Sequence, residues 1–144
     1  MSKLGIILAY SKSFLGLPYI WGGQHPSHGY DCSGLIQELL ASVGFDPIGD
    51  QTAKSLYFEL LHLGNCEVLP VENQKQAGAI LFFGPQIEAI SHVAFAIDTE
   101  HMIESGGGSK TTMDVKTAIA KQAFVRVRPI ARRDDLVACL MPKY

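Results

Sequence analysis

The sequence predicts an α+β domain in which N-terminal helices pack on a mostly antiparallel sheet. Apolar residues recur at helical spacing in the N-terminal part of the 144-residue chain, whereas short β-rich runs follow from Gly78 onward. Helices that precede strands, rather than alternate with them, are typical of this class. The length fits one domain, so we expect residues 1–144 to fold as a single unit.

Three helices are expected in the N-terminal part. The first spans residues 4–15 and ends before Pro18, because proline restricts the residue that precedes it. The second begins at Cys32, carries one apolar stripe and closes at Gly44. The third spans residues 51–63, between a capping threonine and a terminating glycine.

Strands are expected in the C-terminal half, where apolar runs are short or alternate with polar residues. These runs are 79–83, 92–97, 101–104 and 124–129. A short helix is expected over 114–122. Segment 132–144 is interpreted as no more than a capping helix.

Charge and cysteine content exclude several classes. Twelve Lys and Arg against 14 Asp and Glu give a net charge of -2, which argues against nucleic acid as a partner. No apolar stretch approaches the length of a membrane span, and residues 4–10 lack a signal-peptide cleavage site. The three cysteines contain no C-x-x-C pair, so we expect reduced thiols without a thiolate zinc site.

Cys32 is the residue best placed for chemistry. It lies at the start of the second helix, where unpaired backbone N–H groups and the macrodipole stabilise a thiolate. Cys32 lies three residues before Leu35 and seven before Leu39, so helical spacing places its sulfur on the same inward face as this apolar stripe. We therefore expect the thiol to point at the sheet.

A thiolate nucleophile needs a proton shuttle, and His92 is the candidate. Strand alternation places His92 on one face with Ala94 and Ala96. We expect these small residues to let the helix that carries Cys32 approach closely.

Glu104 is the candidate that orients the imidazole. A three-residue hairpin loop over 98–100 would pair Ala94 with Glu104 and set Glu104 diagonally beside His92. A two-residue turn would move Glu104 to the opposite face. His101 is the competitor if the register slips.

The motifs together resemble the NlpC/P60 family of cell-wall cysteine peptidases, over about residues 15 to 107. The resemblance rests on the segments Pro-Tyr-Ile-Trp-Gly-Gly at 18–23, Asp-Cys-Ser-Gly-Leu at 31–35, and Ser-His-Val-Ala-Phe at 91–95, followed by Glu104. It implies a compact papain-like fold and cleavage of the γ-D-glutamyl to diamino-acid bond in peptidoglycan stem peptides.

By this resemblance Cys32 is the nucleophile, His92 the base and Glu104 the third member of the catalytic group. The resemblance also implies four substrate-binding residues: Tyr19, Asp31, Ser33 and Ser91. Two positions depart from the family pattern. The third position is more often His, Asn or Gln, so Glu104 adds a full negative charge, and the usual Gly-Asp before the apolar strand is Gly78-Ala79 here.

Two other functions stay open at this point. One is an amidase or acyltransferase that uses the same thiol, because fold and triad do not choose the bond. The other is a non-catalytic wall-binding or phage structural component. For a peptidase we expect a monomer without cofactor, made without a signal peptide and delivered to the cell wall or periplasm as a lysin or injected effector. An inhibitor or immunity protein is a possible partner.

Three further residues have competing interpretations. His25 and His28 form an H-x-x-H pair that could suggest a metal, but a loop pair without a clear third ligand favours a position bordering the groove. Trp21 is interpreted as a core aromatic residue.

Overall fold

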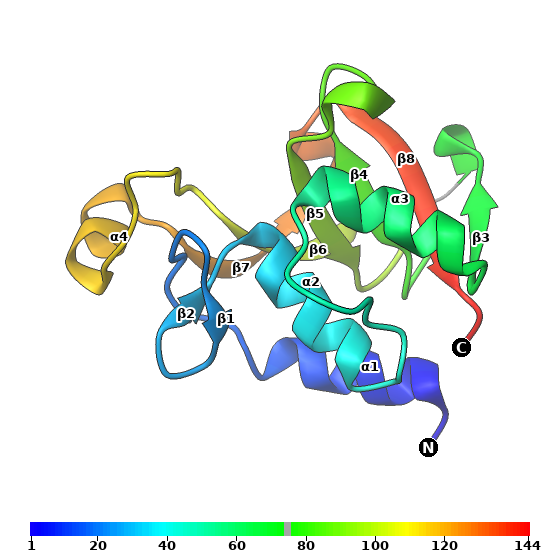
Figure 1. Ribbon diagram of the computed structural model, residues 1–144, viewed down its shortest axis with the longest axis horizontal. Coiled ribbons are helices and arrows are strands. Elements are labelled where there is room, and N and C mark those ends of the chain that lie inside the picture. Colours follow the sequence, from blue (N-terminus) through cyan, green and yellow to red (C-terminus); the bar gives the residue numbers. More distant parts are fainter. Residues whose placement is uncertain (74–75) are drawn as a thin grey trace.

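The computed structural model describes residues 1–73 and 76–144, and it has the predicted α+β class (Figure 1). The helices are α1 (Lys3–Lys12), α2 (Cys32–Ala41), α3 (Ala53–Leu63) and α4 (Val115–Lys121). The strands are β1 (Gln24–His25), β2 (Gly29–Tyr30), β3 (Cys66–Leu69), β4 (Ile80–Phe83), β5 (His92–Ala96), β6 (His101–Gly106), β7 (Phe124–Pro129) and β8 (Leu136–Pro142).

Local sequence signals explain where the helices begin and end. Asp31 caps α2 and Asp114 caps α4 through side-chain oxygens that accept backbone N–H groups. Thr52 and Ser55 form a reciprocal capping box at α3, which stops at Gly64 in the left-handed conformation. The helices predicted from these signals are confirmed, although α1 ends three residues earlier than expected.

Within the part of the chain that the structure describes, six strands form the main sheet in the order β3-β8-β4-β5-β6-β7, and every neighbouring pair is antiparallel. β1 and β2 form a separate hairpin before α2. The predicted strands β4 to β7 are confirmed, whereas β3 and the β1–β2 hairpin were not predicted.

The interpretation of segment 132–144 as a capping helix was wrong. Its main part is β8, which lies inside the sheet and pairs with β3 on one side and β4 on the other. A short apolar run looks alike in a buried helix and a buried strand, and only its partners decide between them. Those partners lie more than 50 residues away along the chain.

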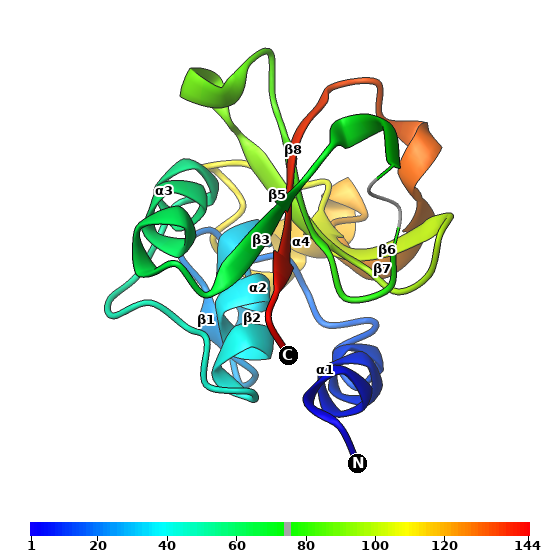
Figure 2. The same cartoon turned by 90° about the vertical axis from the view of Figure 1, so that its right-hand side faces the viewer.

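Helices α1, α2 and α3 cover one face of the sheet, with α2 between the other two (Figure 2). The main core forms where α2 packs on Val93, Phe95 and Ile103. A second apolar cluster lies on the opposite face and contains Ala94 and Ala96. The expectation that these alanines face the helix was therefore wrong, because α2 packs on the other side of β5.

No helix within the described ranges is both long enough and apolar enough to cross a membrane.

The central position of β8 predicts a large cost for truncating its core side chain. Leu140 is 0% exposed, so Leu140→Ala should lower the free energy of unfolding by about 2–5 kcal/mol in a urea titration. Val68, 60% exposed on the paired strand β3, provides the control, and Val68→Ala should cost no more than about 0.5 kcal/mol. Equal effects of the two substitutions would contradict this packing.

Candidate active site

Three segments far apart in the sequence meet at one end of the sheet. Cys32 is the first residue of α2, His92 is the first residue of β5, and Glu104 lies within β6. Pairing of Phe95 with Ile103 leaves residues 98–100 as the hairpin loop. This three-residue loop is the one expected from the sequence, and it sets Glu104 diagonally beside His92 on the same face.

His92 and Glu104 form a buried contact. Nε2 of His92 lies 2.7 Å from Oε2 of Glu104, and the two side chains are only 11% and 3% exposed. Because Glu104 engages Nε2, Nδ1 is the ring nitrogen left for Cys32. His101, the competitor, instead contacts Asp98 at the exposed hairpin loop.

The surroundings of His92 favour its charged form. Burial opposes the imidazolium, but hydrogen bonding and charge from Cys32 and Glu104 outweigh burial and raise the pKa of His92 to about 9. At neutral pH the site is therefore suited to hold His92 as an imidazolium.

Glu104 stays ionised although it is buried. Burial works to raise its pKa, but the hydrogen bond and charge of His92, with the charge of Arg128, lower the pKa below its usual value. Nε of Arg128 lies 3.7 Å from Oε1 of Glu104. The carboxylate thus has a cation near each of its oxygens.

Asp31 holds the start of α2 and with it Cys32. Its Oδ1 accepts the Gly34 N–H at 2.7 Å, and its Oδ2 accepts the Gly22 N–H at 3.0 Å. Ser33 Oγ donates to the same carboxylate at 3.4 Å. Asp31, predicted to bind substrate, therefore caps a helix and anchors the preceding loop in this structure.

Gly34 allows the loop and the helix to meet. A Cβ at this position would collide with the carbonyl oxygen of Gly23 and approach the Asp31 carboxylate. The N–H groups of Cys32 and Ser33 have no acceptor within the described residues. Unpaired donors of this kind are expected in the first turn of a helix.

A buried hydrogen bond ties the strand of Glu104 to the loop that leads to Cys32. Ser105 Oγ donates to the backbone carbonyl of Tyr30 at 2.6 Å. Since Ser105 follows Glu104 and Tyr30 lies two residues before Cys32, this bond limits how far the two sides of the site can separate.

Tyr19 and Cys32 line the same pocket. Burial and the charges of Cys32 and Asp31 raise the pKa of its phenol, so the hydroxyl stays protonated. A Cβ at Gly108 would collide with the Tyr19 ring, which shows how closely the segment after β6 covers this side chain.

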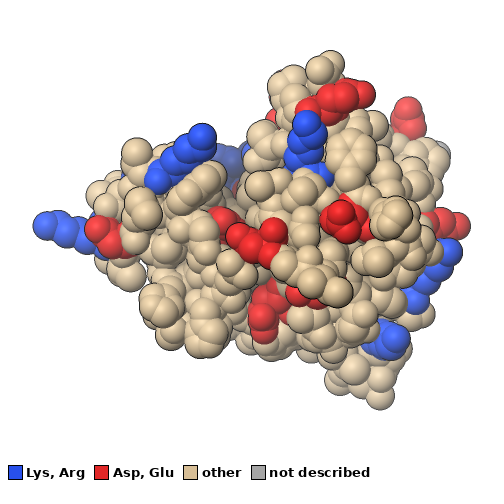
Figure 3. All heavy atoms as spheres, viewed as in Figure 1, with Lys and Arg blue, Asp and Glu red and all other residues tan. Residues whose placement is uncertain are grey.

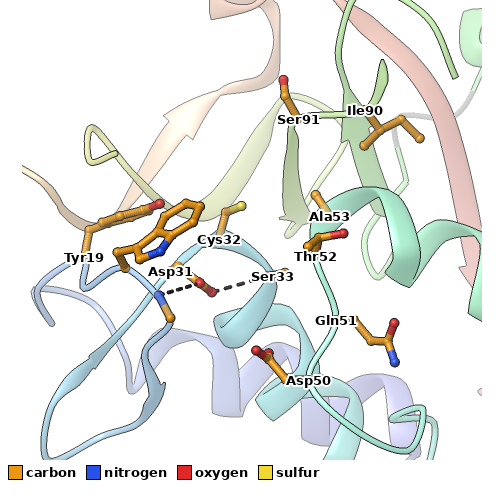
Figure 4. Close-up of a pocket in the computed structure, with 12 residues that line it drawn as sticks. Tyr19, Asp31, Cys32, Ser33, Asp50, Gln51, Thr52, Ala53, Ile90 and Ser91 are labelled. Carbon is orange, nitrogen blue, oxygen red and sulfur yellow. Dashed lines mark hydrogen bonds between the residues drawn. The ribbon is translucent and has the colours of Figure 1, made fainter. Parts of the chain in front are cut away.

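A groove with two lobes passes over Cys32. The first lobe, about 310 Å³, contains all four predicted binding residues, and Figure 4 shows Cys32 with Tyr19 on one side and Ala53 and Thr52 on the other. The second lobe, about 220 Å³, contains His92 and Glu104. Tyr19, Cys32 and Ser91 line both lobes.

Several lining residues were not predicted from the sequence. They are Trp21, Asp50, Gln51, Thr52 and Ile90 in the first lobe and Arg132 and Arg133 in the second. The interpretation of Trp21 as a core residue was wrong, because its side chain is 43% exposed and lines the groove. Its position within the Pro-Tyr-Ile-Trp-Gly-Gly segment was the only available signal.

His25 and His28 lie on the exposed β1–β2 hairpin, where both contact Ser27, and they line neither lobe. The expectation that they border the groove was therefore wrong. Within residues 1–73 and 76–144, no group of three His, Cys, Asp or Glu side chains is arranged to hold a metal ion. All three cysteines are free thiols.

Acidic side chains gather near the middle of the face shown in Figure 3, and the basic ones lie nearer its edges. Asp31 and Asp50 both line the first lobe of the groove.

Known proteins share this sequence pattern and fold. The model of the NlpC/P60 family matches residues 16–129. The bifunctional muramidase/DL-endopeptidase CwlT of Bacillus subtilis is 29% identical over 83% of this chain and 34% of its own length. A γ-D-glutamyl-L-lysine dipeptidyl-peptidase of the same organism is 32% identical over 69% of this chain and 31% of its own. The chain thus spans about a third of these relatives.

Solved structures agree in fold. RipD from Mycobacterium tuberculosis, described as a non-catalytic NlpC/p60 domain protein adapted to peptidoglycan binding, superposes with a TM-score of 0.70 at 21% identity. The superposition covers 100% of this chain and 99% of RipD.

The His92–Glu104 contact predicts an elevated titration midpoint. In an NMR titration His92 should lose its proton near pH 9, and Glu104→Gln should lower that midpoint because a charge is removed. Since the folded-state pKa exceeds the ordinary 6.5, the stabilisation from His92 should be complete below about pH 6.5 and lost as the pH rises through about 9.

Glu100, exposed in the same hairpin, provides the control, and Glu100→Gln should leave the His92 midpoint unchanged. A midpoint near 6.5 in the unmodified protein, or equal midpoints in the two variants, would contradict the assignment.

Proposed function

The chain belongs to the NlpC/P60 family, and on that basis we propose that it is a cysteine endopeptidase that hydrolyses the γ-D-glutamyl to diamino-acid bond of peptidoglycan stem peptides. The observation that carries this proposal is the buried 2.7 Å contact between His92 and Glu104 beside Cys32. A structural histidine at a strand end needs neither a buried carboxylate partner nor a thiol on its other side.

The first chemical step is attack by the Cys32 thiolate on the carbonyl carbon of the scissile amide. The N–H groups of Cys32 and Ser33 are positioned to donate to the oxygen that becomes negative. His92 donates its proton to the leaving amine, and the C–N bond breaks to leave a thioester on Cys32.

The second step hydrolyses that thioester. Neutral His92 takes a proton from water, the resulting hydroxide equivalent adds to the thioester carbonyl, and the thiolate leaves. Glu104 holds the ring in one orientation throughout and stabilises the imidazolium that forms in each cycle. Arg128 in turn balances the charge of Glu104.

Relatives support the choice of substrate. CwlT is named a DL-endopeptidase, and another relative is named a γ-D-glutamyl-L-lysine dipeptidyl-peptidase. An enzyme of this kind acts at the cell wall, where its substrate lies. Monomeric state, delivery as a lysin or injected effector, and an inhibitory partner remain predictions.

A peptidoglycan-binding protein without turnover is the second candidate, favoured by the likeness to RipD. Against it, this chain retains a thiol, an imidazole and a carboxylate in one groove. An amidase or acyltransferase would use the same thioester but a different bond or acceptor.

Mass spectrometry of purified muropeptides tests the proposal. The unmodified protein should release fragments that end in D-glutamate, whereas Cys32→Ala should reduce cleavage by about 10⁴-fold or more because the nucleophile is lost. Cys66 is also half-buried but lines neither lobe, so Cys66→Ala should leave cleavage unchanged.

The products separate the candidates. Intact muropeptides that bind the folded protein would favour the non-catalytic function. Sugar chains freed of peptide, or acyl groups moved to another amine, would indicate the amidase or acyltransferase. Full activity in Cys32→Ala would contradict every mechanism that uses this thiol.

A further inference from the structure

The two lobes of the groove differ in charge. The first, called the acidic lobe, contains Asp31 and Asp50, and its lining includes no lysine or arginine among the described residues. The second, called the basic lobe, contains Arg132 and Arg133 after β7. Glu104 also lines the basic lobe, but its carboxylate is buried and contacts His92 and Arg128. A bound peptide that crosses Cys32 therefore meets two aspartates on one side and two arginines on the other.

The position of His92 indicates which lobe binds the leaving half of the substrate and which lobe binds the acyl half. His92 lines the basic lobe and does not line the acidic one. In the proposed mechanism His92 protonates the leaving amine, so that amine must lie on the His92 side of Cys32. The leaving half of the peptide then occupies the basic lobe, and the acyl half occupies the acidic lobe.

Of the two arginines in the basic lobe, Arg133 is already engaged. Its Nε and Nη2 donate to the two carboxylate oxygens of Asp135 at 2.9 and 2.8 Å. Its guanidinium also lies 4.9 Å from the centre of the Phe83 ring. Arg133 therefore has most of its donors committed to the protein.

Among the described residues, Arg132 is the arginine of this lobe that has no carboxylate partner. Its side chain is exposed, and no carboxylate among the described residues lies within 4.0 Å of it. Burial, then the charges of Arg126 and Arg132, lower the pKa of Arg128 against the opposing charge of Glu104, so some repulsion among these guanidinium groups is left uncompensated. An anion from the substrate would relieve that repulsion.

We propose that Arg132 binds a carboxylate on the leaving half of the substrate and so favours stem peptides whose diamino residue carries one. This inference rests on the proposed function, which supplies the direction of the peptide. A planar guanidinium matches a carboxylate through two parallel N–H donors. The carboxylate has two chemical sources, the side chain of diaminopimelate or the free α-carboxylate at the end of a tripeptide.

Calorimetric binding to Cys32→Ala tests the proposal without turnover. The probes are tripeptides in which L-Ala-γ-D-Glu is followed by lysine or by diaminopimelate. Each tripeptide is used with its terminal α-carboxylate free and with that carboxylate amidated. A further diaminopimelate tripeptide is amidated on the side-chain carboxylate instead. Amidation of the recognised carboxylate should weaken binding about tenfold, the size expected of one charge-assisted contact. Adding Arg132→Ala should remove that difference.

Two further variants sharpen the test. Arg132→Lys keeps the charge but loses the planar fork, so it should retain only part of the preference. Lys12, exposed at the end of α1, lines neither lobe, so Lys12→Ala controls for net charge and should bind like the parent.

Binding and cleavage are measured separately, so failure of this inference can be distinguished from failure of the proposed function. If neither amidation nor the Arg132 substitution changes the affinity, and the unmodified protein cleaves these peptides, the inference is overturned and the proposed function still stands. Arg132-dependent binding without cleavage by the unmodified protein supports the carboxylate site and contradicts the peptidase mechanism. No binding of any tripeptide contradicts both.

Discussion

The buried contact between His92 and Glu104 is the constraint on which the site depends. A carboxylate that is 3% exposed is costly to hold in ionised form, and here the imidazolium and Arg128 compensate for the lost solvation. The contact exists only in one register of the β5–β6 hairpin, and it leaves Nδ1 of His92 for Cys32. Sheet register, ring orientation and thiol chemistry are therefore linked.

Local signals made the positions of the proposed catalytic residues predictable. Cys32 was chosen as the candidate nucleophile because a helix start is recognisable from the apolar stripe that follows it, and Asp31 now explains that start as its cap. Glu104 was placed beside His92 by the length of a three-residue loop, which depends on neighbouring residues alone. Such features need no knowledge of distant parts of the chain.

Features that depend on distant pairing could not be predicted in this way. The place of β8 between β3 and β4 is set by partners far away in the sequence. The face of β5 that meets α2 follows from the bulk of Val93 and Phe95, which fill the main core, and not from the space beside Ala94. Likewise, Arg132 reaches the groove only because the chain after β7 returns to it.

Labelling with an active-site probe is the most direct test of the account. The probe is L-Ala-γ-D-Glu with a chloromethyl ketone in place of the scissile amide, and intact and peptide mass spectrometry locate the label. We predict one label on Cys32 with loss of chloride, slower labelling in His92→Ala, and unmodified Cys66 and Cys139. A label on another residue, or a folded protein that takes no label, would contradict the assignment of Cys32 as the nucleophile.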